Sequence, residues 1–273
     1  MKTTLIVSDI HLGAHNSQGP ELLSLLQTDF DRLILNGDTI DHLNFARFRS
    51  QDWAVLSELQ AIAQERELVL IRGNHEGNQD SEHRVGPPDV LARLLGVDLH
   101  EEFVVEIQNQ RYLILHGDQF DSTLNLTNIG YAAEGCYKFV QRCSRPVARW
   151  LKSCVKHYCG VVHSVSRGAI AYAQGKNCQG VITGHTHYHE DLWIDGLHYV
   201  NTGCWVDWPC TYLEIRGSHI KLCSWHQNRS ELLTDRRVLP HQAMSETPVL
   251  RPEPVLATNS SAVAEGEILV AHG

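Results

Sequence analysis

Short apolar runs bounded by charged or turn residues constrain the fold of this chain more than any other feature. Three of them, residues 2–8, 31–36 and 67–72, have the length of buried strands. Helical patterns lie between them, near residues 21–27 and 52–66. Because strand–helix–strand–helix–strand successions with short connections pair their strands in parallel, the sequence predicts an α/β fold.

Further strand-length runs follow in the rest of the chain, several of them separated by gaps short enough for hairpins. We expect strands at 103–107, 111–115, 180–183, 198–201, 212–215 and 220–224. The hairpin-length gaps add antiparallel pairing to the parallel core. Within 52–66, apolar residues at helical spacing predict one buried face, made of Trp53, Leu56, Leu59, Ile62 and Ala63.

Five of these expected strands each end in a small group of potential metal ligands. The groups are Asp9-Ile10-His11, Gly37-Asp38-Thr39-Ile40-Asp41, Gly73-Asn74-His75-Glu76, His116-Gly117-Asp118 and Gly184-His185-Thr186-His187. A single aspartate after a strand is usually a turn or cap residue, and a single histidine is more often solvated than a ligand. Five groups in succession instead favour one shared site, because ligands of open α/β sheets bind outside the carboxyl ends of the strands.

The ligand types predict divalent metals. Carboxylate, imidazole and amide-oxygen ligands together suit Mn²⁺, Fe²⁺, Zn²⁺ or Mg²⁺. The candidates are Asp9, His11, Asp38, Asn74, His116, His185 and His187. Seven ligands are too many for one ion but enough for two that share a carboxylate. Two ions roughly 3.5–4 Å apart stabilise the attacking and leaving oxygens of an in-line phosphoryl displacement.

Charge and cysteine content exclude several other classes of protein. The net charge of −9 and the pI near 6.0 argue against a protein that coats nucleic acid or cuts DNA in a broad basic groove. The eight cysteines form no C-x-x-C pair and are expected to be reduced. A zinc knuckle from Cys154 and Cys159 stays open as an alternative. The apolar run Leu5–Val7 is too short for a signal-peptide core and no segment is long enough to span a membrane, so we expect a cytoplasmic protein.

Two segments differ in composition from the rest. Residues 122–176 carry eight basic residues against one acidic residue, which places +7 there and −16 on the remainder. Part of this segment is amphipathic and fits either an anionic membrane or lipid surface or an ordinary helix packed on the core. Residues 227–273 hold four of the nine prolines and no sustained period, so we expect a disordered tail after a domain spanning 1–226.

The ordered motifs D-x-H, G-D-x-x-D, G-N-H-[DE], H and G-H-x-H resemble the calcineurin-like metallophosphoesterases. The resemblance spans about residues 3–225, including Asn201-Thr202-Gly203, which is similar to the closing N-x-G of that family. It implies a β-sandwich flanked by helices, with 122–176 as a helical cap insertion. It also implies a metal-dependent hydrolase whose bridging hydroxide attacks phosphorus in line.

The same resemblance implies roles for individual residues. Asp9, His11, Asp38 and His187 would hold one metal, and Asp38, Asn74, His116 and His185 the other, with Mn²⁺ expected first and Fe²⁺, Zn²⁺ or Mg²⁺ as alternatives. His75 would protonate the leaving oxygen or stabilise charge on the phosphoryl oxygens, and Asp41 would orient that histidine. Five of the 17 histidines thereby have an assigned place.

The layout of the insertion resembles the branch that contains UDP-2,3-diacylglucosamine hydrolase, the LpxH-like branch. It implies a UDP-sugar lipid or another lipid-linked pyrophosphate as substrate, and a peripheral position on the inner face of the membrane. A phosphorylated small molecule is the broader expectation for the partner, and no nucleic acid is expected. Two alternatives stay open, a nucleotide or cyclic-nucleotide phosphodiesterase and a non-catalytic scaffold on the same fold.

Overall fold

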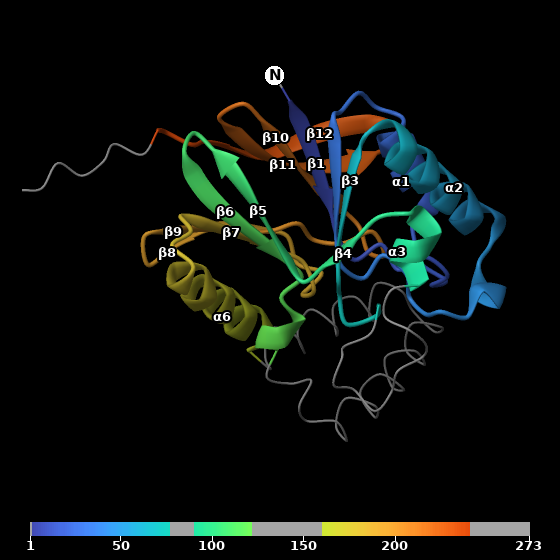
Figure 1. The fold of residues 1–273 in the computed structure, drawn as a ribbon, viewed down its shortest axis with the longest axis horizontal. Coiled ribbons are helices and arrows are strands. Elements are labelled where there is room, and N and C mark those ends of the chain that lie inside the picture. Colours follow the sequence, from blue (N-terminus) through green and yellow to red (C-terminus); the bar gives the residue numbers. More distant parts are fainter. Residues whose placement is uncertain (1, 77–89, 122–159, 241–273) are drawn as a thin grey trace, which may run out of the picture. The chain divides into compact units, whose positions relative to one another are not determined.

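Two β-sheets lie face to face, with helices on their outer sides (Figure 1). The computed structural model describes residues 2–76, 90–121 and 160–240, which belong to one compact unit. The seven-stranded sheet has the order β12-β11-β10-β1-β2-β3-β4. Its strands are β1 (Thr3–Val7), β2 (Arg32–Asn36), β3 (Glu67–Ile71), β4 (Leu99–His100), β10 (Cys210–Arg216), β11 (His219–His226) and β12 (Arg229–Arg237).

The second sheet has five strands in the order β5-β6-β7-β9-β8. They are β5 (Glu102–Ile107), β6 (Gln110–Leu115), β7 (Gly180–Thr183), β8 (Glu190–Ile194) and β9 (Leu197–Asn201). The pairs β1–β2, β2–β3 and β3–β4 are parallel, as are β6–β7 and β7–β9, and the remaining pairs are antiparallel. The predicted α/β fold, with two sheets flanked by helices, is confirmed.

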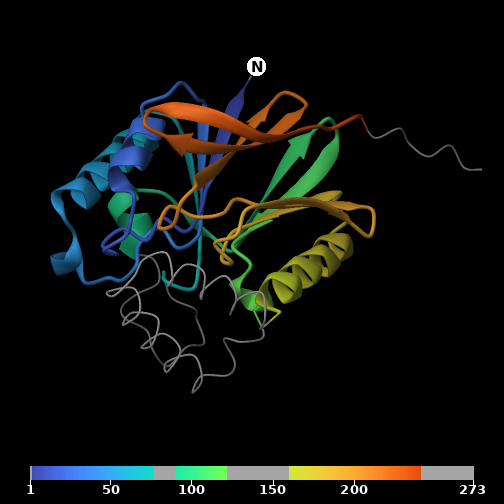
Figure 2. The same cartoon turned by 180° about the vertical axis from the view of Figure 1, so that it is seen from behind.

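The helices cover the two outer faces of the sheets, as the reverse view in Figure 2 also shows. Helices α1 (Gly19–Leu26), α2 (Ser50–Glu65) and α3 (Val90–Leu95) pack on the larger sheet, and α6 (Val161–Gly175) packs on the smaller one. Two short 3₁₀ helices, η1 (Phe45–Arg47) and η2 (Asp118–Phe120), follow β2 and β6. The result is a four-layer arrangement of helices, sheet, sheet and helix.

Alternation along the strands builds the core between these layers. In β1, Leu5 and Val7 point to the helices, whereas Ile6 points to the second sheet, because successive side chains of a strand face opposite sides. Both faces of β1, β2 and β3 are therefore largely apolar, and the groups of charged and imidazole side chains come after these strands end. This places the chemistry at the strand ends.

The predicted buried face of α2 is wrong at Trp53, which is 46% exposed and lies against Phe45 and Phe48. Asp52 is buried instead, because its carboxylate accepts hydrogen bonds from the backbone nitrogen and Nε of Arg49 at the start of the helix. The apolar residues of α2 that face the sheet are Val55, Leu56, Leu59 and Ile62.

The predicted end of the domain is also wrong. Residues 229–237, expected in a disordered tail, form β12 and pair with β11 along its length. The connecting turn, Gln227-Asn228, has positive φ at both residues, as a tight type I′ hairpin requires. Two segments named in the sequence analysis lie outside the described residues. They are residues 241–273 and residues 122–159, the latter belonging to the predicted cap insertion and including Cys154 and Cys159.

Candidate metal centre

The loops after β1, β2, β3, β6 and β7 meet at one end of the paired sheets. Backbone hydrogen bonds join the loop after β1 to the loop after β2, and the loop after β6 to the loop after β7. The amide of Asp9 donates to the carbonyl of Gly37 at 3.1 Å, and the amide of Gly184 donates to the carbonyl of His116 at 3.0 Å. The carboxyl ends of strands from both sheets thus bring all the residues predicted from the five motifs into one region.

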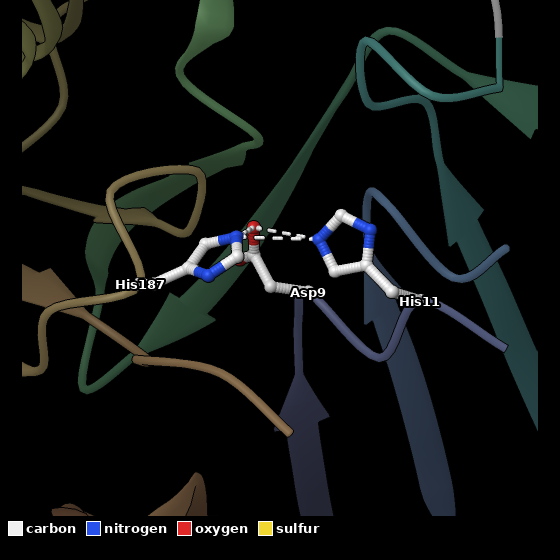
Figure 3. A group of neighbouring side chains, drawn as sticks. All are labelled: Asp9, His11 and His187. Atoms are coloured by element: carbon white, nitrogen blue, oxygen red, sulfur yellow. Dashed lines mark hydrogen bonds and ion pairs between the residues drawn. The ribbon is translucent and has the colours of Figure 1, made fainter. Parts of the chain in front are cut away.

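A first cluster consists of Asp9, His11 and His187, whose potential ligand atoms all lie within 4.8 Å of one another (Figure 3). His187 Nε2 lies 3.1 Å from Asp9 Oδ1 and 3.2 Å from His11 Nε2. The carboxylate of Asp9 is fully buried. Two imidazole nitrogens and a carboxylate oxygen therefore face one small volume.

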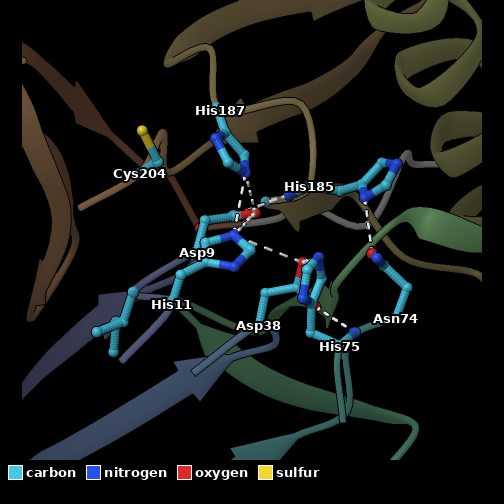
Figure 4. A network of polar contacts seen from close by, with 12 residues as sticks. Asp9, His11, Asp38, Asn74, His75, His185, His187 and Cys204 are labelled. Carbon is cyan, nitrogen blue, oxygen red and sulfur yellow. Dashed lines mark hydrogen bonds and ion pairs between the residues drawn. The ribbon is translucent and has the colours of Figure 1, made fainter. Parts of the chain in front are cut away.

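A second cluster consists of Asp38, His116 and His185, again with potential ligand atoms within 4.8 Å of one another. Asn74 adjoins it, with its Oδ1 3.1 Å from His185 Nδ1. Asp38 Oδ2 lies 3.4 Å from His116 Nε2 and 3.8 Å from His11 Nε2, so Asp38 faces both clusters. Figure 4 shows Asp38 among the labelled side chains of the site, which include His11, Asn74 and His185.

The outer nitrogens of the second cluster are held by hydrogen bonds. His116 Nδ1 donates to the carbonyl of Asn36 at 2.9 Å, and His185 Nε2 donates to the buried carboxylate of Asp121 at 2.9 Å. Because an imidazole whose outer nitrogen donates keeps a lone pair on the other nitrogen, both rings are left ready to ligate a cation. Asp121 was not among the predicted residues, although it ends the stretch His116-Gly117-Asp118-Gln119-Phe120-Asp121.

The backbone is unusual at five of the candidate residues. Asp9, His11, Asp38, His185 and His187 have φ between 49° and 64°, the left-handed region that non-glycine residues rarely adopt. The other described non-glycine residues with positive φ lie in hairpin turns or just after α6. Left-handed conformations cost about 1–3 kcal/mol each and concentrate at functional sites. The conformation turns these five side chains back toward the site.

Glu76 ties the second and third loops together and was also missed as a site residue. It is buried, and its Oε2 accepts from the amides of Asp38 at 2.8 Å and Gly73 at 3.0 Å. Burial and the nearby Asp38 raise the pKa of Glu76. A Cβ at Gly73 would lie 2.2 Å from Asp38 Oδ1, so only glycine lets the two loops approach this closely.

The pKa shifts of the buried carboxylates and imidazoles show that the site favours positive charge next to Asp38. Burial alone would raise the pKa of Asp38, yet the imidazoles of His116 and His75 hold that pKa well below its usual range. Burial would likewise lower the pKa of His116, but Asp38 and Asp9 raise it well above its usual value. The carboxylates of Asp38 and Asp9 thus stabilise a positive charge beside them. A bound divalent cation would provide that charge in place of a proton on His116.

Buried polar atoms without hydrogen-bond partners also indicate that these residues can bind a metal. Asp9 Oδ1 and His116 Nε2 are buried and have no hydrogen-bond partner, although both point into the clusters. Asn74 Oδ1 lies 3.1 Å from His185 Nδ1, so an amide oxygen and a ring nitrogen that can both ligate a cation adjoin each other there. Oxygen and nitrogen donors with unfilled lone pairs are what a divalent ion takes up.

Comparison with known families agrees with this geometry. Residues 2–189, which carry all five motifs, match the family described as calcineurin-like phosphoesterase. The chain belongs to the calcineurin-like phosphoesterase family. It is accordingly a metal-dependent phosphoesterase, and members of this family typically bind two divalent metals.

Solved structures with the same fold include YfcE, a phosphoesterase from E. coli, at 16% identity and a TM-score of 0.50, covering 87% of this chain and 100% of that one. Vps29 from Cryptosporidium parvum aligns at 15% identity and a TM-score of 0.47, covering 86% and 98% of the two chains. An archaeal phosphodiesterase aligns at 14% identity and a TM-score of 0.44, covering 85% and 99%. No curated protein sequence matches the chain significantly.

His75 and Asp41 lie beside the first cluster of this phosphoesterase. His75 Nδ1 donates to the backbone carbonyl of Asp41 at 2.8 Å, which leaves Nε2 facing Asp38 Oδ2 at 3.9 Å. The Asp41 carboxylate lies 3.6 Å from His11 Nδ1, and Arg47 pairs with its other oxygen at 2.7 Å. Burial opposes the shift, but His11 lowers the pKa of Asp41 to about 2. Asp41 thus contacts His75 through its backbone and His11 through its carboxylate.

Proposed function

We propose that this phosphoesterase hydrolyses phosphodiester or phosphoric anhydride bonds with two divalent ions held side by side. The observation that carries the proposal is the position of Asp38, whose Oδ2 lies 3.4 Å from His116 Nε2 and 3.8 Å from His11 Nε2. A single carboxylate that faces two sets of lone pairs is suited to bridge two ions.

The ligand sets follow from the two clusters. Asp9, His11 and His187 would hold one ion and Asn74, His116 and His185 the other, with Asp38 shared. Ions bound there would withdraw charge from the phosphoryl oxygens and lower the pKa of a water molecule toward neutrality. The chain itself contributes a mostly buried set of donors, in which outer hydrogen bonds fix the direction of the His116 and His185 rings.

His75 is the proposed proton donor. Its Nδ1 is occupied by the Asp41 carbonyl, so Nε2 is the nitrogen directed at the site. Burial opposes protonation, but Asp38 and the Asp41 carbonyl raise the pKa of His75 above its ordinary value. A protonated Nε2 beside the reacting phosphate can donate its proton to the departing oxygen, or a hydrogen bond to a phosphoryl oxygen.

Replacing His75 tests this role. We expect His75→Ala to lower the turnover of bis-p-nitrophenyl phosphate by about 10²- to 10⁴-fold, the usual effect of removing a general acid. The metal content should stay that of the wild type, because His75 belongs to neither ligand set. His15→Ala, an exposed histidine in the loop after β1, is the matched control and should keep full turnover. Unchanged turnover in His75→Ala would remove the assigned role.

A lipid-linked pyrophosphate, such as a UDP-sugar lipid, is the finer proposal for the substrate. Its support is the composition of residues 122–176 and the LpxH-like layout of the insertion. Of the eight basic residues, the structure describes two. Arg167 is exposed on α6, and Lys176 pairs with Glu102 and contacts the Tyr172 ring. Mn²⁺ as the native metal, and a cytoplasmic location at the inner membrane face, are parts of the same proposal. No described helix is long and apolar enough to cross a membrane.

A substrate panel on protein reconstituted with Mn²⁺ separates the alternatives. It compares a lipid-linked pyrophosphate, a nucleotide diphosphate-sugar without lipid, cyclic nucleotides and a phosphopeptide. The lipid-linked proposal expects the first to have the highest kcat/KM. A higher kcat/KM on cyclic nucleotides would favour the alternative function of a nucleotide phosphodiesterase. If the metal-loaded chain turns over none of the substrates, the proposed hydrolase activity is contradicted.

A further inference from the structure

A third group of potential metal ligands shares His187 with the first cluster. His187, Cys204 and Asp207 each offer one atom, and these three atoms lie within 4.8 Å of one another. We call these three residues the outer cluster. In Figure 4 the ring nitrogen of His187 that does not face Asp9 and His11 is turned toward Cys204. The two nitrogens of one imidazole therefore face two different ligand sets.

The loop that carries Cys204 and Asp207 is held firmly against the loop after β1. The amide of Trp205 donates to the carbonyl of Asp9 at 3.0 Å, and the amide of Gln18 donates to the carbonyl of Trp205 at 2.8 Å. Asn16 Nδ2 donates to the carbonyl of Val206 at 2.9 Å. Cys204 and Asp207 thus have defined positions beside His187 on a fixed backbone.

The donor set of the outer cluster is softer than that of the main site. Cys204 is a free cysteine, 2% exposed, and its thiol makes a long contact of 3.9 Å to the Asp207 carbonyl. Asp207 is partly exposed and offers a route for an ion. Thiolate, imidazole and carboxylate together select Zn²⁺ and similar thiophilic ions, whereas the main clusters contain only oxygen and nitrogen donors.

We propose that His187, Cys204 and Asp207 form a binding site for a thiophilic divalent cation such as Zn²⁺ or Cd²⁺, and that filling it removes His187 from the first cluster. A neutral imidazole has one nitrogen lone pair. When the outer nitrogen gives its lone pair to an ion, Nε2 carries the proton, so it can donate a hydrogen bond to Asp9 or His11 but cannot ligate a metal. Binding releases the thiol proton to solvent, so one proton leaves for each ion bound at neutral pH.

The spacing of the atoms permits this site. In a filled tetrahedral zinc site the donor atoms are about 3.5 Å apart, given metal–ligand bonds of about 2.0–2.3 Å. Closure from 4.8 Å or less requires shifts of roughly 1 Å or smaller, which the side chains of Asp207 and His187 can make. A water molecule would complete the coordination. The ion would therefore act as an inhibitor that competes with the catalytic metal for one histidine.

Binding is tested on the full chain stripped of metal and titrated with Cd²⁺. Coordination by Cys204 produces a thiolate-to-cadmium charge-transfer band in the ultraviolet, which the main site, without sulfur, cannot produce. Cys204→Ser should weaken this Cd²⁺ binding by at least about tenfold, since even the loss of an outer-shell partner costs 10- to 100-fold. Cys178→Ser, another buried free cysteine, is the matched control and should keep the band.

A second variant protects the test against misfolding. Asp207→Asn keeps the thiol and changes a partly exposed side chain, and it should weaken Cd²⁺ binding in the same direction. A band of undiminished amplitude in Cys204→Ser, or an equal loss in Cys178→Ser, would overturn the proposed site.

The removal of His187 from the first cluster by an ion in the outer cluster is tested separately, and this part of the inference rests on the proposed function. Zn²⁺ added to the Mn²⁺-loaded wild type should inhibit bis-p-nitrophenyl phosphate hydrolysis, and Cys204→Ser should need at least about tenfold more Zn²⁺ for the same inhibition. Equal Zn²⁺ sensitivity of the two proteins would contradict the exclusion. If no activity appears in either protein, the proposed function fails, while the Cd²⁺ band still decides the outer site.

Discussion

The two clusters of the metal centre differ in how firmly their histidines are held. In the second cluster both outer ring nitrogens donate hydrogen bonds of 2.9 Å, one to the Asn36 carbonyl and one to the Asp121 carboxylate. In the first cluster the outer nitrogen of His11 lies 3.6 Å from Asp41, and that of His187 faces the outer cluster. The histidines of the second cluster are thus held by short hydrogen bonds, whereas the contact behind His11 in the first cluster is longer.

Burial sets His116 and His187 furthest apart. The side chain of His116 is 1% exposed and that of His187 is 15% exposed, whereas His11 and His185 lie between them at 7% and 10%. A site whose ligands are already oriented loses less side-chain entropy when it binds an ion, so it binds more tightly. The comparison predicts one tightly held ion near His116 and one exchangeable ion near His187.

Removing the carboxylate common to both clusters should have the largest effect. We expect Asp38→Ala to lose at least one of the two ions by elemental analysis, and to lower turnover by at least about 10³-fold, the upper cost of losing one electrostatic stabiliser. Asp29→Ala, an exposed carboxylate before β2, is the control and should leave both measures unchanged. If Asp38→Ala retains two ions, Asp38 is not a ligand shared by both clusters, and the two clusters are not linked through it.

Stepwise removal of metal should separate the two clusters. Limited chelation of the wild type should remove one ion quickly and the second slowly. The slow ion should persist in His187→Ala and be lost in His116→Ala, because only His116 belongs to the firmly held cluster. Metal content after gel filtration measures both. The opposite pattern, a slow ion that depends on His187, would reverse the proposed order of affinity.

The sequence pattern predicted that the candidate residues follow strands, and the structure brings them together at one end of the two sheets. Asp9 and Asp38 follow apolar runs within two or three residues, and parallel pairing of their strands brings them to the same edge of the larger sheet. His116 follows β6 of the smaller sheet, so it joins them only through the packing of the two sheets, which the sequence pattern does not specify. The contacts behind these residues could not be predicted in the same way. Glu76 and Asp121 act on residues 38 and 64 positions away, and no local pattern specifies such a pairing.

The errors in the fold have the same origin. Apolar periodicity placed Trp53 in the core, whereas the structure buries its neighbour Asp52, which accepts hydrogen bonds from Arg49. Strand β12 has no buried face along its length, so its sequence lacks the alternation by which strands are predicted. Its pairing with β11 through a two-residue turn defines it, and that turn was a weak signal within a polar segment.

The smallest effect is expected from removing the support behind a ligand. Asp121→Ala should weaken binding of the slowly released ion by about 10- to 100-fold, because His185 loses the acceptor that fixes its Nε2–H and directs Nδ1 to the site. Asp121→Asn keeps an acceptor oxygen and should recover part of that loss. The matched control is Asp118→Ala. Asp118 lies in η2 and its carboxylate also raises the pKa of His116, but among the described contacts it makes no hydrogen bond to His185. Competition with a chelator of known affinity measures all three variants. An equal loss in Asp118→Ala and Asp121→Ala would mean that charge alone, and not the hydrogen bond to His185, distinguishes the second cluster from the first.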